Sequence, residues 1–156
     1  MADMSFEEFI RTYNGQYKES NEVYHRLARH CGLSDSAFWI LYTLREAEGP
    51  VSQKQLCDEL YLSKQTVNSA LKNLEGAGYL RLESPPDNRK SKEIRLTPSG
   101  EELMRRTVDP VFAMEERAFQ RLTVEEREAI LRLGRRNLDL LREEAERLLS
   151  GEETSL

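Results

Sequence analysis

The sequence predicts a mainly α-helical protein in which a winged helix-turn-helix is flanked by long N- and C-terminal helices. Three observations predict this fold class. After Pro50, two serine-capped helical patterns follow each other closely, as in a helix-turn-helix. Two stretches of period-two alternation come next, separated by a turn-rich loop, which is typical of a two-stranded β-hairpin wing. Long amphipathic patterns precede and follow this region.

The length of 156 residues suits a single domain over 1–156. Within it we expect the winged helix-turn-helix to occupy 34–97. The long helices over 5–32 and 98–149 then form a separate helical region, which we interpret below as a dimerisation region.

The N-terminal segment predicts two helices. Ser5 and Glu8 have the spacing of a capping box, in which the hydroxyl and the carboxylate each satisfy a free backbone N–H. Apolar residues then recur along one stripe until Gly32 ends the helix. Ser34 can cap a second helix, which ends before Gly49.

Two further serines begin the helix-turn-helix. Ser52 and Gln55 form another capping box at the start of a short helix. Ser63 follows after a short break and can cap a helix that runs to about Leu74. The apolar residues of this helix recur at i, i+3, i+4 and i+7, so that one face is predicted to be buried.

The hairpin and the C-terminal helices complete the order of elements. Residues 79–83 and 93–97 alternate with period two, and the polar loop between them is rich in turn formers. The Thr97-Pro98 pair is typical of a helix start and predicts a helix to about 120. Thr123 begins a third capping box, and the last helix runs to about Leu149.

Composition excludes several classes of protein. No stretch approaches the roughly 18 consecutive apolar residues of a membrane span. The acidic start of the chain lacks the basic and apolar regions of a signal peptide. The two cysteines, Cys31 and Cys57, suggest no disulfide framework, and we expect a cytoplasmic protein.

Motifs of catalysis are also missing from the sequence. It contains no Gly-rich phosphate loop, no metal-binding helix motif and no nucleophile elbow. Carboxylates occur in pairs such as Glu125-Glu126, which read as helix surface. We therefore expect no enzymatic activity, no cofactor and no metal site.

The net charge of −5 is unevenly distributed along the chain. Of the 23 Lys and Arg and the 28 Asp and Glu residues, eight and six lie between Val51 and Ser99. That segment carries +2, and the flanking segments, with fifteen and twenty-two, carry −7. The predicted winged helix-turn-helix is thus mildly basic, and the acidic surplus belongs to solvated helix faces.

The helix that begins at Ser63 has the residue types of a DNA-recognition helix. The second helix of a helix-turn-helix enters a major groove. Amide and hydroxyl side chains can pair with base edges, and lysines suit phosphates. No acidic residue lies between Ser63 and Asn73 to repel a DNA backbone. The candidate contacts on this helix are Ser63, Lys64, Gln65, Thr66, Asn68, Ser69 and Lys72.

The hairpin loop supplies a second group of cations. Arg89, Lys90 and Lys92 cluster there, where a long cation can reach a narrow minor groove. Asp87 lies two residues before Arg89, and we hypothesise that it orients the guanidinium through a charge-assisted hydrogen bond.

Three motifs in the middle of the chain resemble the winged-helix signature of the MarR family, the multiple antibiotic resistance regulators. They are Leu71-x-x-Leu74-Glu75-x-x-Gly78-Tyr79-Leu80, Asp87-x-Arg89 and Ile94-x-Leu96-Thr97-x-x-Gly100. The flanking helices have the number, length and order expected of that family, so the resemblance covers nearly the whole chain. One departure is that Asn88 and Lys90 stand where many members carry a second wing arginine.

The resemblance implies a function and a mode of action. Members are bacterial and archaeal homodimers that bind palindromic double-stranded DNA operators, most of them as repressors. Many release DNA when a small phenolic or other ligand binds, and a small aromatic or phenolic effector is therefore a candidate partner here. By resemblance, Arg89 is the wing arginine that enters the minor groove, and the helix over 63–74 is the recognition helix.

The flanking helices suggest a dimer and an effector site. The last helix has apolar residues on more than one narrow stripe, which is more than packing on one neighbour requires. A two-fold dimer would present two recognition helices roughly 34 Å apart. The resemblance places a small-molecule pocket near these helices, for which the candidate residues are Tyr13, Tyr17, Tyr24, Trp39 and Tyr42.

Two alternatives stay open from the sequence. The winged helix could be an adaptor that binds another protein and never DNA. The chain could also be a redox-responsive regulator that uses Cys31, which has His30 beside it and His25 nearby. The sequence does not separate repressor from activator, and it does not name the operator, the regulated genes or the effector.

Overall fold

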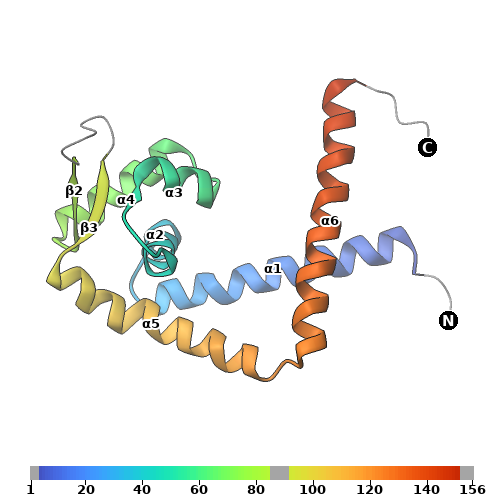
Figure 1. The fold of residues 1–156 in the computed structure, drawn as a ribbon, viewed down its shortest axis with the longest axis horizontal. Helices are drawn as coiled ribbons and strands as arrows, with labels where there is room; N and C mark the ends of the chain where they lie inside the picture. Colours follow the sequence, from blue (N-terminus) through green and yellow to red (C-terminus); the bar gives the residue numbers. More distant parts are fainter. Residues whose placement is uncertain (1–3, 85–91, 152–156) are drawn as a thin grey trace. The chain divides into compact units, whose positions relative to one another are not determined.

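The computed structural model describes residues 4–84 and 92–151 of the chain (Figure 1). These residues form six helices and three short strands. In chain order the elements are α1 (Phe6–His30), α2 (Asp35–Glu46), β1 (Val51–Ser52), α3 (Gln53–Leu60), α4 (Lys64–Gly76), β2 (Leu80–Glu83), β3 (Glu93–Leu96), α5 (Pro98–Gln120) and α6 (Val124–Ser150). They group into two compact units, Met1–Phe112 and Ala113–Leu156.

The helix starts predicted from the sequence are confirmed by cap geometry. The hydroxyls of Ser5, Ser34 and Ser63 each accept a hydrogen bond from the backbone N–H three residues further on. Ser52 and Thr123 form complete capping boxes with Gln55 and Glu126. Each cap satisfies backbone donors that the first turn of a helix leaves free.

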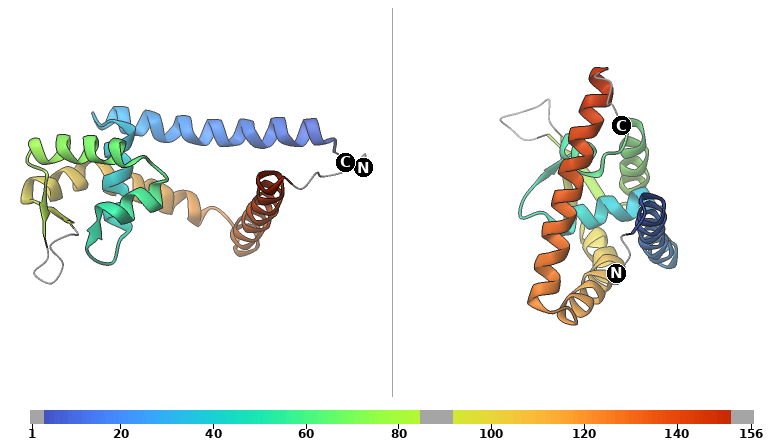
Figure 2. Two further views of the ribbon diagram at one scale, coloured as in Figure 1. Left: turned by 90° about the horizontal axis from the view of Figure 1, so that it is seen from above. Right: turned by 90° about the vertical axis from the view of Figure 1, so that its right-hand side faces the viewer.

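The first helix is long and uninterrupted. α1 covers 25 residues (Figure 2) and ends where Gly32 adopts a φ of +69°, a left-handed conformation that glycine reaches without a steric penalty. The segment then turns into α2, as the sequence predicted from Gly32 and Ser34.

The sheet has one strand more than the predicted hairpin. β2 and β3 pair antiparallel, with Leu82 opposite Ile94, and this hairpin was expected. β1 adds to the other edge of β3 with Val51 opposite Ile94, so the strand order is β1-β3-β2. A strand of two residues is too short to produce a period-two pattern, which is why sequence reasoning missed it.

The hydrophobic core lies in the first unit. Ile40 and Leu41 of α2, Leu56 of α3 and Leu71 of α4 are fully buried there. Ile94 contributes from the sheet and joins the same cluster, which also includes side chains of α5. The sheet therefore presents one apolar face to the helices, and its other face carries charged residues.

A close backbone contact joins the hairpin to α5. The backbone N–H of Thr97 donates to the Tyr79 carbonyl at 3.0 Å, and the Thr97 hydroxyl donates to the Gly78 carbonyl at 2.6 Å. The same hydroxyl accepts from the Gly100 N–H at 3.1 Å and so caps α5. Gly100 is required because a Cβ there would lie 1.9 Å from the Tyr79 carbonyl oxygen.

The second unit consists of the end of α5 and the whole of α6. The Arg127 guanidinium lies 3.7 Å from the ring centroid of Phe119 and donates to the Phe119 carbonyl at 3.1 Å. α6 has no buried residue and exposes a series of leucines. Over the residues described, neither α6 nor any other helix combines the length and apolar character needed to cross a membrane.

Candidate nucleic-acid interface

One face of α4 is polar and exposed, and the opposite face is buried. Val67 and Leu71 are fully buried, and Ala70 and Leu74 are nearly so. The exposed residues among the predicted contacts are Ser63, Lys64, Gln65, Thr66, Ser69 and Lys72. The structure therefore brings these six predicted residues together on the surface of one helix and the residue that caps it.

The start of α4 is held by its own hydroxyls. The Ser63 hydroxyl accepts from the Thr66 N–H at 3.1 Å, and the two hydroxyl oxygens lie 2.8 Å apart. This arrangement fixes both side chains at the first turn of the helix. Both hydroxyls keep hydrogen-bonding capacity, because each oxygen can take part in three hydrogen bonds.

Asn68 differs from the other predicted residues of α4. Its side chain is partly buried, and its amide oxygen accepts a hydrogen bond from the side-chain amide of Gln53 on α3. Sequence reasoning treated Asn68 as a base-facing residue and did not anticipate Gln53. The two residues are 15 positions apart, and nothing in the sequence pattern of either helix links them.

Most of the predicted wing contacts lie outside the described residues. These are Asp87, Arg89 and Lys90, for which the roles stay predictions. Lys92 is described and exposed, and its carbonyl accepts from the Gln53 backbone N–H at 3.4 Å. Gln53 therefore contacts Lys92, just before β3, through its backbone and Asn68 of α4 through its side chain.

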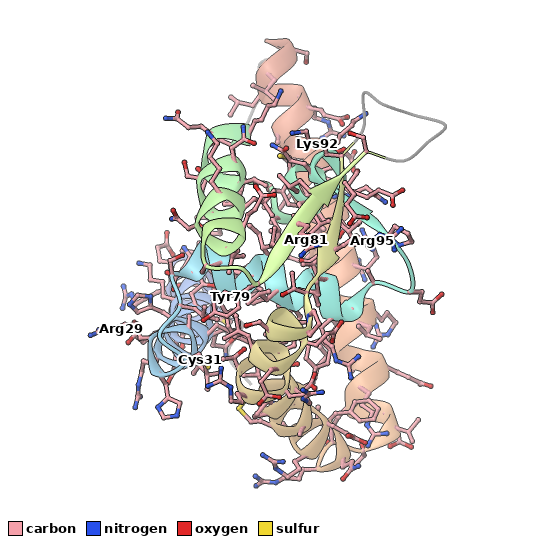
Figure 3. All side chains as sticks on the ribbon, turned by 90° about the vertical axis from the view of Figure 1, so that its left-hand side faces the viewer. Arg29, Cys31, Tyr79, Arg81, Lys92 and Arg95 are labelled. Atoms are coloured by element: carbon pink, nitrogen blue, oxygen red, sulfur yellow. The ribbon has the colours of Figure 1, made fainter. Side chains whose placement is uncertain are left out.

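The outer face of the hairpin carries cations that sequence reasoning missed. Arg81 and Arg95 are exposed and lie directly opposite each other in the β2–β3 register. Figure 3 shows both on the strands, with Lys92 at the end of β3 nearer the loop. The Arg95 guanidinium pairs with the Glu93 carboxylate at 2.9 Å. The period-two alternation of the two strands already predicts that residues 81 and 95 lie on the polar side of the hairpin. This signal was available in the sequence.

Two further exposed residues lie on α4 or in the turn before it. Asn73 lies on the exposed side of α4 and was not among the predicted contacts. Tyr61, in the turn between α3 and α4, has its side chain 86% exposed and a φ of +52°. A left-handed conformation is uncommon for a residue with a Cβ, and such strain concentrates at functional sites.

The five predicted effector-site aromatics separate into two groups. The Tyr24 and Trp39 rings lie 5.0 Å apart, and the Trp39 and Tyr42 rings lie 5.2 Å apart. The Tyr42 ring stacks on Phe112 of α5 at 4.6 Å. Tyr13 stacks instead on Phe9 within α1, and Tyr17 is exposed further along α1. We call Tyr24, Trp39, Tyr42 and Phe112 the aromatic cluster.

Charged groups lie at one edge of the aromatic cluster. The Arg45 guanidinium is 5.7 Å from the Phe112 ring centroid, and it pairs with the Asp109 carboxylate at 2.6 Å. The pair connects α2 with α5 beside the stacked rings. Both side chains are partly exposed, so a polar ligand group could reach them from solvent.

The environment of Cys31 does not favour a reactive thiolate. Burial raises the pKa of the Cys31 thiol above its usual value. The thiol donates a long hydrogen bond, 3.8 Å, to the Thr107 carbonyl. His25 faces Asp35, with Nδ1 2.9 Å from both carboxylate oxygens, and is not directed at the cysteine. Within 4–84 and 92–151 no group of three or more His, Cys, Asp or Glu side chains is arranged to hold a metal ion.

The fold and this surface define a winged-helix fold in which α4, the second helix of the helix-turn-helix, exposes a polar face. Residues 32–91 match the family model described as MarR family. The HTH-type transcriptional regulator PecS of Dickeya dadantii (strain 3937) is 38% identical over 79 residues, which are 49% of this chain and 48% of PecS. The chain thus matches about half the length of this curated relative.

Two solved structures are similar over most of the chain. Sco3205, a MarR family transcriptional regulator from Streptomyces coelicolor in complex with DNA, has a TM-score of 0.70 and 22% identity, over 89% of this chain and 90% of that one. BpsR of Bordetella bronchiseptica, from a study of regulation of its DNA binding by 6-hydroxynicotinic acid, has a TM-score of 0.59 and 21% identity, over 80% and 97%. The family model thus covers residues 32–91 of the chain, and the two solved structures, at 22% and 21% identity, show the likeness of the fold.

Proposed function

We propose that this protein binds double-stranded DNA as a homodimer and regulates transcription in the cytoplasm, as a repressor at a palindromic operator. The observation that carries the proposal is the exposed face of α4. From Lys64 to Asn73 that face holds amide, hydroxyl and lysine side chains without a carboxylate, while its opposite face is buried in the core. Glu75, in the last turn, accepts a hydrogen bond from the Leu82 backbone N–H. An exposed helix surface without acids, in second position of a helix-turn-helix, suits a major groove.

The side chains divide into two roles by chemistry. Lys64, Lys72 and Lys92 suit phosphates, which position the protein without reading sequence. Gln65, Thr66 and Ser69 suit base edges, because amides and hydroxyls can match their donors and acceptors. Asn68 belongs with this second group. In the wing, Arg89 is proposed for the minor groove, with Asp87 orienting its guanidinium, and Lys90 is proposed for a phosphate like the other lysines.

The terminal helices support the homodimer. α1 exposes Phe6 and Tyr17, and α6 exposes a face of leucines. Contiguous exposed apolar faces are uncommon on monomeric proteins and mark interaction surfaces. Burial of the same faces on a second copy gives a two-fold arrangement, which matches a palindromic operator.

The aromatic cluster is the proposed effector site. Stacked rings with a cation at the edge suit a small aromatic ligand that carries a phenolate or carboxylate. Tyr24, Trp39 and Tyr42 stand together there, while Tyr13 and Tyr17 lie elsewhere on α1. That the DNA binding of BpsR is regulated by 6-hydroxynicotinic acid adds support for a ligand of this class.

The test is DNA binding measured at several salt concentrations. Fluorescence anisotropy with the promoter DNA beside its own gene should give an affinity that falls with salt, because bound lysines release counterions from DNA. Lys72→Ala should weaken binding to every sequence alike. It should also reduce the slope of log affinity against log salt by about 0.9 for each lysine lost, so roughly two for a dimer.

Lys18→Ala is the matched control, since Lys18 is an exposed lysine on α1. It should leave affinity and slope unchanged. Salt-independent binding, or no binding to promoter or random duplex DNA, would contradict the proposal and favour a protein-binding adaptor.

A further inference from the structure

Gln53 contacts both proposed DNA-binding elements. It is the first residue of α3 and is partly buried. Its side-chain amide N–H donates to the amide oxygen of Asn68 on the recognition helix. Its backbone N–H donates to the Lys92 carbonyl at the base of the wing, at 3.4 Å.

The backbone of Gln53 is fixed on both sides. Ser52 pairs with Glu93 in the β1–β3 register. The Ser52 N–H also donates to the Gln55 side chain at 2.8 Å, and the Gln55 N–H donates back to the Ser52 hydroxyl at 3.2 Å. Because the backbone beside it is constrained in this way, the Gln53 side chain starts from a fixed position, and this limits where its amide can lie.

The direction of the hydrogen bond determines what Asn68 can offer to a ligand. An asparagine amide has an acceptor oxygen on one side of a plane and a donor NH₂ group on the other. When Gln53 donates to the oxygen, that oxygen is held toward α3 and the NH₂ group is turned away from it. The NH₂ group is then the part of Asn68 that remains for a base.

We propose that Gln53 is a positioning residue that sets the base preference of Asn68. This inference rests on the proposed DNA binding. With its NH₂ group presented, Asn68 favours the major-groove acceptors, which are N7 and O6 of guanine, N7 of adenine and O4 of thymine. It disfavours the cytosine N4 amino group, which is a donor. Gln53 itself touches no base.

Two substitutions at position 53 separate this role from a merely structural one. Gln53→Met keeps the length of the side chain and removes its donor, so the Asn68 amide is released and the base preference at one position of each half-site should relax. Gln53→Glu replaces the donor by a carboxylate, which only accepts. The Asn68 NH₂ group must then turn toward residue 53, which presents the oxygen outward and shifts the preference toward cytosine N4 and adenine N6.

The measurement is selection of binding sites from a randomised DNA library at fixed salt, followed by anisotropy on the selected sites and their single-base variants. In Gln53→Met, discrimination at the Asn68 position should fall by about fivefold, which corresponds to one hydrogen bond. Discrimination at other positions should be retained. Gln16→Met, an exposed substitution of the same type on α1, is the matched control. Thermal unfolding should show that all variants are folded.

Each outcome has a definite meaning. If Asn68→Ala changes the selected sequence but both Gln53 variants select the wild-type sequence, Gln53 does not position Asn68 and the inference is wrong. If Asn68→Ala leaves the selected sequence unchanged, Asn68 reads no base and the inference is equally wrong. In both cases the proposed function stands. Failure of the wild-type protein to bind any duplex would overturn the proposed function instead.

Discussion

At the scale of single residues, Gly100 is determined by one close contact. A Cβ at this position would lie 1.9 Å from the carbonyl oxygen of Tyr79 and 2.9 Å from its carbon. These are backbone atoms of the connection between α4 and β2, so they cannot move aside without disturbing the hydrogen bond from the Thr97 N–H. Because glycine has no Cβ, α5 can approach the hairpin this closely.

We expect Gly100→Ala to lower the free energy of unfolding by about 2–3 kcal/mol, because the added methyl group overpacks a rigid backbone contact. Chemical denaturation followed by circular dichroism measures this loss. Gly15→Ala is the matched control, since a Cβ at position 15 of α1 meets no atom within 4 Å. There alanine should stabilise the helix by about 0.5–1 kcal/mol. Equal effects of the two substitutions would contradict the assigned role of Gly100.

The sequence predicts which residues matter better than it predicts the contacts that those residues make. The sequence singled out Thr97 and Gly100 as parts of a motif, but only the structure gives the reason, which is the approach to Tyr79. The hydrogen bond from Gln53 to Asn68 could not be predicted at all. It joins side chains of two helices, and its existence depends on how these helices pack.

At the scale of the elements, the prediction succeeded where a signal was local. Every serine or threonine that was expected to cap a helix does so, because a cap depends on residues only three positions apart. β1 was missed, because its two residues become a strand only through pairing with β3. The split of the aromatic residues between α1 alone and the aromatic cluster also depends on packing between helices.

The aromatic cluster brings α1, α2 and α5 together around the single tryptophan of the chain. Because Trp39 has no other tryptophan beside it to mask its signal, its fluorescence reports on the cluster alone. A small aromatic acid such as benzoate should quench this fluorescence saturably and should release DNA over the same concentration range. Tyr42→Leu, which removes the ring between Trp39 and Phe112, should weaken both effects together.

The contrary result is easily recognised in the same titration. Quenching that grows linearly and matches that of free N-acetyltryptophanamide is collisional, and it would mean that the aromatic cluster holds no ligand. The cluster would then serve only to pack α2 against α1 and α5.

At the scale of the whole molecule, the charge and the apolar surface have different locations. The segment Val51–Ser99, with its eight basic and six acidic residues, is mildly basic although the chain carries −5. The exposed leucines belong instead to α6, which has no buried residue of its own. Ile130, Leu131, Leu138, Leu141, Leu148 and Leu149 recur on one face of that helix at helical spacing. A helix with such an exposed apolar face and no buried residue is expected to bury that face against a partner. We propose that the partner is a second copy of the chain.

This face of α6 is where we expect the dimer to form, and Leu138 and Leu141 near its centre are 40% and 54% exposed. Replacing both by glutamate should convert the dimer into a monomer at micromolar concentration, because burial of two carboxylates in an apolar interface is strongly unfavourable. Sedimentation velocity measures the change. The affinity for a palindromic operator should fall at least tenfold, since a monomer holds one half-site only, whereas linked half-sites raise avidity by about 10²-fold or more.

Arg136→Glu is the matched control, because it changes the net charge by the same amount on the opposite face of α6 and Arg136 is exposed. It should leave the protein dimeric and its operator affinity nearly unchanged. A wild-type protein that sediments as a monomer, or a double glutamate variant that stays dimeric, would show that this face of α6 does not hold the dimer together. The recognition helices would then have to be paired by another surface, for which the exposed aromatic residues of α1 are the next candidate.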